Sequence, residues 1–245
     1  FKTHYAESAA NLEMMWIEPG SFLMGSSEDE ANHAVNEMQH DVNLTNGFYL
    51  GKYEVTQSQY EVVMNGNPGG VSSTPSQYPG TARPVEKISW DEAILFCTRL
   101  TEFEQSLGRL PQGWKYTLPT ESEWEYVCRA GTNSSYSWGE SISSTNANFL
   151  KNIAQTSDVG QYPSNPWGFF DMNGNVWEWT ADWYDANYKT SLGSDLLETE
   201  VTSTKSARGG SWSDIQKDLR SASRIGIGPA GRYDILGFRI ALKGI

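Results

Sequence analysis

The chain contains little cysteine and histidine, and neither occurs where its motifs are densest. Cys97, Cys128, His4, His33 and His40 are the only such residues among 245. Two cysteines are too few for a disulfide framework. Histidines near one end do not form the cluster that an iron site needs. We expect His33 and His40 to be solvated or capping residues of the acidic loop at 26–40.

The sequence also lacks a long apolar run and an overall excess of positive charge. No stretch is long enough to span a membrane as a helix. The formal net charge of −12 argues against a nucleic-acid partner. Residues 208–245 nevertheless carry seven Lys/Arg against three Asp/Glu. This segment is either an anion-binding face or a set of buried arginines tied to carbonyls and carboxylates.

Glycine, proline and tryptophan are abundant, with 23, 10 and 10 residues. This composition predicts a loop-rich body with a real core rather than a helical bundle. No linker, low-complexity block or fixed-period repeat divides the chain. We therefore expect a single domain over 1–245 with its core at about 14–242, and a monomer. No targeting segment is readable, and an extracytoplasmic or cell-surface location is the expectation.

Short alternating stretches predict strands early in the chain. Residues 14–25 read as two strands around a turn at Pro19-Gly20. Residues 41–55 read as a strand pair with its turn near Asn46-Gly47, because Asn-Gly is a strong hairpin signal.

Three capping boxes, led by Thr56, Ser89 and Thr120, predict three helices. Regular structure is expected to thin out after Gly131, apart from a closing strand near 238–242. The helices after Ser89 and Thr120 should bury one apolar face each, comprising Ala93, Phe96, Cys97, Leu100 and Phe103 in the first and Trp124, Val127 and Cys128 in the second.

Seven motifs follow one another along the chain. They are G-x-F-x-M-G (20–25), F-Y-x-x-K-Y-E-V-T-x-x-Q-Y (48–60), P-V-x-x-I-S-W-D-E-A (84–93), L-P-T-E-x-E-W-E-Y (118–126), G-N-V-W-E-W (174–179), R-G-G-S-W (208–212) and G-F-R (237–239). In this order they resemble the sulfatase-modifying-factor family, which includes the formylglycine-generating enzyme. The resemblance implies an α+β, C-type-lectin-like fold with an enlarged loop region.

The family's copper oxidases, which convert a sulfatase cysteine to formylglycine, carry two cysteines shortly after G-G-S. Paired thiolates suit soft Cu(I). Here Asp214 stands at the first position and the second has no counterpart. The departure implies no copper and no oxidase activity. In disulfide-bearing relatives the positions of Cys97 and Cys128 pair with C-terminal cysteines, which Ser221 and Ile240 replace here. We expect two buried free thiols, with a Cys97–Cys128 bond as the alternative.

The resemblance also implies Ca²⁺. Its hard oxygen ligands would come from the G-N-V-W-E-W turn and, in a looser match, from oxygens near 156–158 and the preceding loop. The residues concerned are Asn175, Val176 and Glu178, and then Asn148 and Phe149. The alternative is that Asn175 and Glu178 only tie down the turn.

Two functions remain open. The family includes noncatalytic domains on kinases and the variable proteins of bacterial diversity-generating retroelements. Segment 213–235 would then display a surface for a protein or carbohydrate ligand, through Asp214, Ile215, Gln216, Lys217, Asp218, Ile225, Ile227, Tyr233, Asp234 and Ile235. Its scaffold would be Leu219, Arg220, Ala222, Arg224, Phe238 and Arg239. The other function is a metal-dependent oxidase with a noncysteine site at Ser211 and Asp214.

Overall fold

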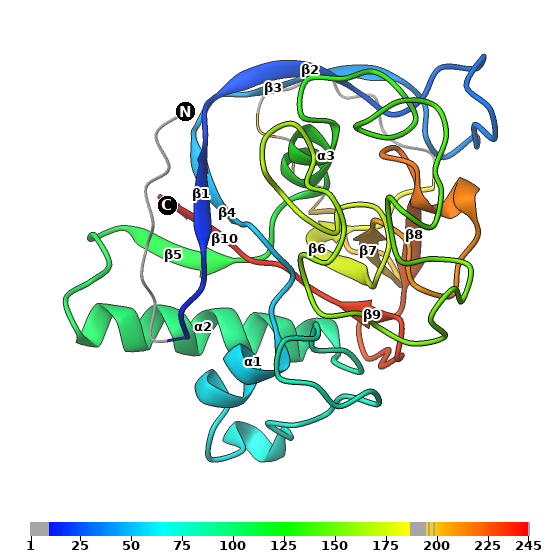
Figure 1. Ribbon diagram of the computed structural model, residues 1–245. Helices are drawn as coiled ribbons and strands as arrows, with labels where there is room; N and C mark the ends of the chain where they lie inside the picture. Colours follow the sequence, from blue (N-terminus) through cyan, green and yellow to red (C-terminus); the bar gives the residue numbers. More distant parts are fainter. Residues whose placement is uncertain (1–9, 187–194, 196, 198, 245) are drawn as a thin grey trace.

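The structure is a computed structural model that describes residues 10–186, 195, 197 and 199–244 (Figure 1). His4 lies outside the described residues. Among those described, no helix has the length and apolar composition that crossing a membrane requires.

The first four strands form a long bent ribbon. Strands β1 (Met14–Ile17) and β2 (Gly20–Met24) make one arm, and β3 (His40–Leu44) and β4 (Phe48–Gly51) make the other. β1 pairs with β4 and β2 pairs with β3, both antiparallel. The two strands predicted on either side of residues 46–47 are present as β3 and β4, but the prediction that they pair with each other is wrong. Pro19-Gly20 and Asn46-Gly47 lie opposite each other where the ribbon bends. Each therefore changes the direction of its strand without folding the chain back into a hairpin.

The two ends of the chain meet in one sheet of order β1-β4-β10-β5 (Figure 1). β10 (Ala241–Gly244) lies between β4 and β5 (Trp114–Thr117) and is antiparallel to both. The closing strand was thus predicted, but it begins three residues later than expected.

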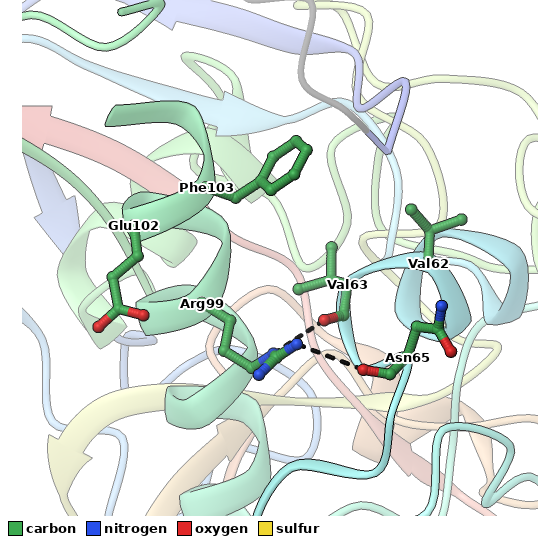
Figure 2. A pocket seen from close by; sticks show the side chains of 6 residues that line it. All are labelled: Val62, Val63, Asn65, Arg99, Glu102 and Phe103. Carbon is green, nitrogen blue, oxygen red and sulfur yellow. Dashed lines mark hydrogen bonds between the residues drawn. The ribbon is translucent and has the colours of Figure 1, made fainter. Parts of the chain in front are cut away.

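The three predicted helices are confirmed, and both reciprocal bonds of each capping box are present. They are α1 (Gln57–Val63), α2 (Trp90–Ser106) and α3 (Glu121–Arg129), and a short 3₁₀ helix, η1 (Pro68–Gly70), follows α1. The predicted faces are buried except at Phe103, which is 48% exposed. Phe103 lies in the last turn of α2, beyond the core, where it lines a hollow beside α1 (Figure 2).

A second sheet occupies the region that was expected to lack regular structure. Its order is β8-β7-β6-β9, with β6 at Trp177–Trp183, β7 at Lys205–Arg208, β8 at Arg224–Ile227 and β9 at Leu236–Gly237. β6 is buried over its first four residues, so both of its faces are covered there and the sequence shows no alternation. A second 3₁₀ helix, η2 (Gln216–Leu219), lies between β7 and β8.

Phe238 joins the helices to the second sheet. Its ring packs edge-on against Phe96, at 5.2 Å between centroids, and against Tyr60 at 6.3 Å. Tyr60 and Phe96 are stacked on each other at 5.6 Å. All three side chains are fully buried. Phe238 directly follows β9, so its packing fixes where the C-terminal segment returns to the core.

Replacing Phe238 by Ala should therefore lower the free energy of unfolding by about 3–5 kcal/mol, because a large buried ring leaves a cavity. Phe103→Ala is the matched control, since its ring is half exposed, and it should cost about 1 kcal/mol or less. Urea unfolding of both variants measures the difference. Equal losses would show that Phe238 is not a core anchor.

Candidate binding surface at the C-terminal segment

Two buried arginines tie the segment that follows β7 to α3 and β6. Arg208 is ion-paired with Glu125 and also donates to both carbonyls of residues 222–223, at 2.9 and 2.6 Å. Arg239 forms two hydrogen bonds with Glu178, at 2.6 and 2.7 Å. Such bidentate pairs hold the planar guanidinium in one orientation.

Two further arginines reach the acidic loop and α3. Arg220 bonds both oxygens of Glu37 and one of Glu30, each at 2.8 Å. Arg224 pairs with both oxygens of Glu121. All four arginines are buried. Of the two interpretations of the basic segment, the second is therefore correct for these four arginines. They are buried and bind carboxylates and carbonyls, and they do not form an anion-binding face.

The six predicted scaffold residues are all buried, and none of the ten predicted display residues is. Among the latter, Ile215, Gln216, Lys217 and Tyr233 are exposed, with Ile215 at 45% and Tyr233 at 52%. The six half-buried ones are Asp214, Asp218, Ile225, Ile227, Asp234 and Ile235.

Several half-buried display residues have internal partners. Asp214 accepts hydrogen bonds from Trp177 Nε1, at 2.9 Å, and from the Ser211 hydroxyl. Asp234 accepts a hydrogen bond from the Tyr78 hydroxyl at 3.3 Å. The three half-buried isoleucines pack against the main core. Of the ten predicted surface residues, the four that are most accessible to a ligand are therefore Ile215, Gln216, Lys217 and Tyr233.

The loop at 149–154 was not predicted to lie beside segment 213–235. Its Leu150 N–H donates to the Asp214 carbonyl at 2.8 Å, and its Lys151 N–H donates to the Trp212 carbonyl at 2.7 Å. The loop thus lies directly against the display segment. The available signal was two aliphatic residues, Leu150 and Ile153, in an otherwise polar stretch.

The thiols are as expected. Cys97 and Cys128 are free and buried, so the alternative bond between them is absent. Cys128 Sγ lies 3.6 Å from Ser221 Oγ, the position from which relatives supply a cysteine. Burial raises the pKa of Cys128 to about 11, so its thiolate is scarce at neutral pH.

His33 and His40 each form a hydrogen bond within the acidic loop. His33 Nδ1 lies 2.8 Å from Ser26 Oγ, and His40 Nδ1 lies 2.9 Å from the Met38 carbonyl. His40 is buried rather than solvated.

The predicted calcium ligands fit only in part. Both Glu178 oxygens are engaged, one by Arg239 alone and the other by Arg239 and Trp124, so its carboxylate is already neutralised. The Asn175 side-chain oxygen accepts from the Ser157 N–H at 2.9 Å, and the Val176 N–H donates to Glu54 at 3.2 Å. These groups tie down the turn.

The looser half of the predicted set fits better. Asn148 Oδ1 and Thr156 Oγ1 are buried without a hydrogen-bond partner among the described residues. The Phe149 carbonyl follows Asn148 in the chain and accepts one hydrogen bond, from the Asn152 N–H. Within the described part, no group of three or more His, Cys, Asp or Glu is suited to a metal. Neutral oxygens of Asn148, Phe149 and Thr156 would therefore supply most of the coordination.

Glu54 and Asp171 were not foreseen. Burial and the charges of Asp171 and Glu178 raise the pKa of Glu54 well above its usual range. Burial likewise raises the pKa of Asp171 to about 6. Glu54, Asp171 and Glu178 all act on the charge of Arg239, and the raised pKa values of Glu54 and Asp171 favour their neutral forms beside the Arg239–Glu178 ion pair.

A hollow of about 480 Å³ is lined by the end of α1 and the C-terminal half of α2 (Figure 2). Arg99 lines it and donates to the Val63 carbonyl at 2.9 Å and the Asn65 carbonyl at 3.3 Å. Val62 and Phe103 are exposed at its rim. It contains none of the predicted display or metal residues.

Comparisons with known proteins identify the family and the fold of the chain. Residues 2–243 match the family model described as sulfatase-modifying factor enzyme 1-like domain. The chain belongs to this family. Serine/threonine-protein kinase pkn1 of Chlamydia caviae is 30% identical over 257 residues, which cover 95% of this chain and 38% of the kinase. The chain therefore spans well under half of that relative.

Two solved structures show the same fold over nearly their whole length. PvdO from Pseudomonas aeruginosa has a TM-score of 0.86 at 25% identity, covering 99% of this chain and 98% of its own. Variable protein 1 of Treponema denticola has a TM-score of 0.80 at 25% identity, covering 98% of both chains. The predicted α+β fold, a C-type-lectin-like fold of the formylglycine-generating-enzyme type, is confirmed.

We propose that Ca²⁺ binds at Asn148, Phe149 and Thr156. The melting temperature should then rise in Ca²⁺ and fall in EDTA, because a ligand that binds only the folded state stabilises it. Asn148→Ala should abolish this Ca²⁺-dependent shift. Ser89→Ala, which removes the cap of α2, should lower the melting temperature but keep the shift. A wild-type melt that is identical in Ca²⁺ and EDTA would exclude the site.

Glu86 lies beneath the contact between Tyr78 and Asp234. It is fully buried, its Oε1 accepts from the Tyr78 N–H at 2.9 Å, and its Oε2 has no hydrogen-bond partner among the described residues. Burial raises the pKa of Glu86 from 4.5 to about 7, against the backbone hydrogen bonds of Tyr78 and Gln77, with smaller and opposite effects from the charges of Asp234 and Lys87.

Folding therefore favours the protonated form of Glu86, and its contribution to stability falls as the pH rises from about 4.5 to about 7. Glu86→Gln should stabilise the protein at pH ~8, and the gain should vanish at pH ~4.5. Glu61→Gln, on an exposed position of α1, should change stability little at either pH. Thermal melts at both pH values test this; a Glu86→Gln gain that is independent of pH would refute it.

Proposed function

We propose that the chain is a noncatalytic ligand-binding protein that displays segment 213–235. The observation that carries the proposal is the contrast within this segment. Two buried arginine–glutamate pairs inside the segment, at Arg220 and Arg224, and two that flank it, at Arg208 and Arg239, fix the path of the backbone. The side chains of Ile215, Gln216, Lys217 and Tyr233 are exposed to solvent. A rigid frame with exposed side chains limits the entropy lost on binding.

The oxidase alternative is not favoured. Asp214 stands where the oxidases carry their first cysteine, and its carboxylate is held by Trp177 and Ser211. Ser211 is itself fully buried, so its hydroxyl does not meet a substrate. Neither residue is placed as a nucleophile or as a ligand for soft copper.

The likeness to variable protein 1 of Treponema denticola supports a second part of the proposal. We infer that segment 213–235 is diversified, since its exposed positions can change while its buried frame stays constant. A near-identical template repeat beside the gene, together with a reverse transcriptase gene, is the decisive observation. A neighbourhood without either would restrict the proposal to a binding surface of fixed sequence.

Substituting Gln216, Lys217 and Tyr233 together by Ser should lower the free energy of unfolding by less than about 1.5 kcal/mol, because exposed positions each contribute about 0.5 kcal/mol or less. Arg224→Ala should cost about 3–5 kcal/mol, since it removes the two-bond partner of the buried Glu121 carboxylate and leaves the more distant Arg208 Nε, at 3.8 Å, as its ion-pair partner among the described residues. Urea unfolding compares the two variants. If the triple variant unfolds as readily as Arg224→Ala, the segment is core and not a display surface.

A further inference from the structure

We propose that the charge of Glu86 controls how firmly residues 229–234 of the display segment are held against residues 76–90. When Glu86 is neutral, the two stretches stay in contact. When Glu86 is ionised, residues 229–234 open and Tyr233 leaves its position on the surface. The inference rests on the proposed function, because it describes the regulation of the same surface by pH.

Residues 229–234 form a loop that is held in place by separate bonds. The loop lies between β8 and β9 and belongs to neither strand. The Lys87 N–H donates to the Tyr233 carbonyl at 3.0 Å, and the Trp90 N–H donates to the Pro229 carbonyl at 3.0 Å. A loop that is bonded at separate points, outside a sheet ladder, can open without unfolding the core.

Tyr78 connects this loop to Glu86. Its backbone N–H donates to Glu86 Oε1 at 2.9 Å, and its hydroxyl donates to Asp234 Oδ2 at 3.3 Å. Its ring packs edge-on against Trp212, at 5.5 Å between centroids, and the Trp212 Nε1–H donates to the Asp234 carbonyl at 3.1 Å. Tyr78 therefore contacts both carboxyl groups, and a change in the charge of Glu86 acts on the residues that hold Asp234.

The position of Glu86 opposes its ionisation. Glu86 is fully buried, and its Oε2 has no hydrogen-bond partner among the described residues. An ionised carboxylate there has lost its water, and one of its oxygens has gained no donor in exchange. Burial accordingly raises the pKa of Glu86 to about 7. The charged or titratable groups that face it are Asp234 of the loop, its chain neighbour Lys87 and the Tyr78 hydroxyl.

The loop at 229–234 is the side that opens. On the opposite side, the bond from the Tyr78 N–H to Glu86 becomes stronger when the carboxylate is charged. On the loop side, Asp234 carries the same charge as ionised Glu86 and repels it. The opening ends at Ile235, because its carbonyl accepts from the first N–H of β6 at 2.8 Å.

The direction of the pH dependence follows from the raised pKa of Glu86. Ionisation opposes the closed loop, so the closed loop is fully stabilised below pH 4.5 and loses this stabilisation as the pH rises to about 7. Tyr233 is one of the four exposed display residues. A ligand that contacts Tyr233 therefore meets an ordered surface at mildly acidic pH and an opened loop at alkaline pH.

Amide hydrogen exchange, followed by NMR on the whole chain, tests the proposal. The amides of Lys87 and Trp90 report on the opening, because they donate to the loop. At pH ~8 they should exchange at least about tenfold more slowly in Glu86→Gln than in wild type, since one pKa unit corresponds to a factor of ten. At pH ~4.5 the two proteins should exchange equally. Glu61→Gln, on an exposed position of α1, is the matched control and should exchange like wild type at both pH values.

Asp234→Asn gives a second test that leaves Glu86 in place. It keeps the size of the side chain and removes the like charge, so it should also slow exchange of the Lys87 amide at pH ~8, by a smaller factor than Glu86→Gln. Wild-type exchange in Glu86→Gln at pH ~8 would overturn the proposal, as would a difference that persists at pH ~4.5. A higher melting temperature without slower exchange would also overturn it, because Glu86 would then act on the whole fold and not on the loop.

The exchange measurement needs no ligand, so it separates this inference from the proposed function. If the triple serine variant of the display segment unfolds as readily as Arg224→Ala, the proposed function fails whatever the exchange of the Lys87 amide shows. If that variant is stable and the exchange does not depend on Glu86, the display surface stands and its regulation by pH is wrong.

Discussion

The structure depends on ion pairs between arginines late in the chain and glutamates that precede them. Arg208 with Glu125 and Arg239 with Glu178 are buried on both sides. Each partner alone would be a charge in a medium of low dielectric, so neither half is tolerable without the other. Together with the packing of Phe238, these pairs determine where the loop-rich C-terminal segment lies. The same pairs explain why a basic C-terminal segment does not imply an anionic ligand.

The elements that could be predicted are those whose signals are local. Thr56, Ser89 and Thr120 cap their helices through residues three positions away, so the sequence contained the whole interaction. The β6 strand could not be recognised, because a strand buried on both faces has no alternating pattern. Pairing of β1 with β4 could not be read either, since Asn46-Gly47 looks the same in a hairpin as in a bend.

For the candidate site, residue types were enough to predict which residues form the buried scaffold, but not which contacts the remaining residues make. Arg220 and Arg224 were predicted as ties because a planar guanidinium suits carboxylates and carbonyls, and both are buried in such pairs. Asp214 looked equally suited to face solvent, and only the structure shows that Trp177 holds it. Leu150 was missed because its place beside the display segment depends on two hydrogen bonds between distant backbones, which leave no mark in the sequence.

Closure of the first sheet depends on the folding of segment 213–235, because β10 follows this segment in the chain. β10 inserts between β4 and β5, and it is made after everything from β7 to β9. Until it arrives, β4 and β5 each present an edge with unsatisfied backbone groups, which is a site for misassembly. If the scaffold residues of segment 213–235 cannot pack in their native positions, β10 cannot reach its place between β4 and β5. The protein therefore couples correct folding of segment 213–235 to closure of its first sheet, so that a chain in which this segment misfolds loses the whole fold.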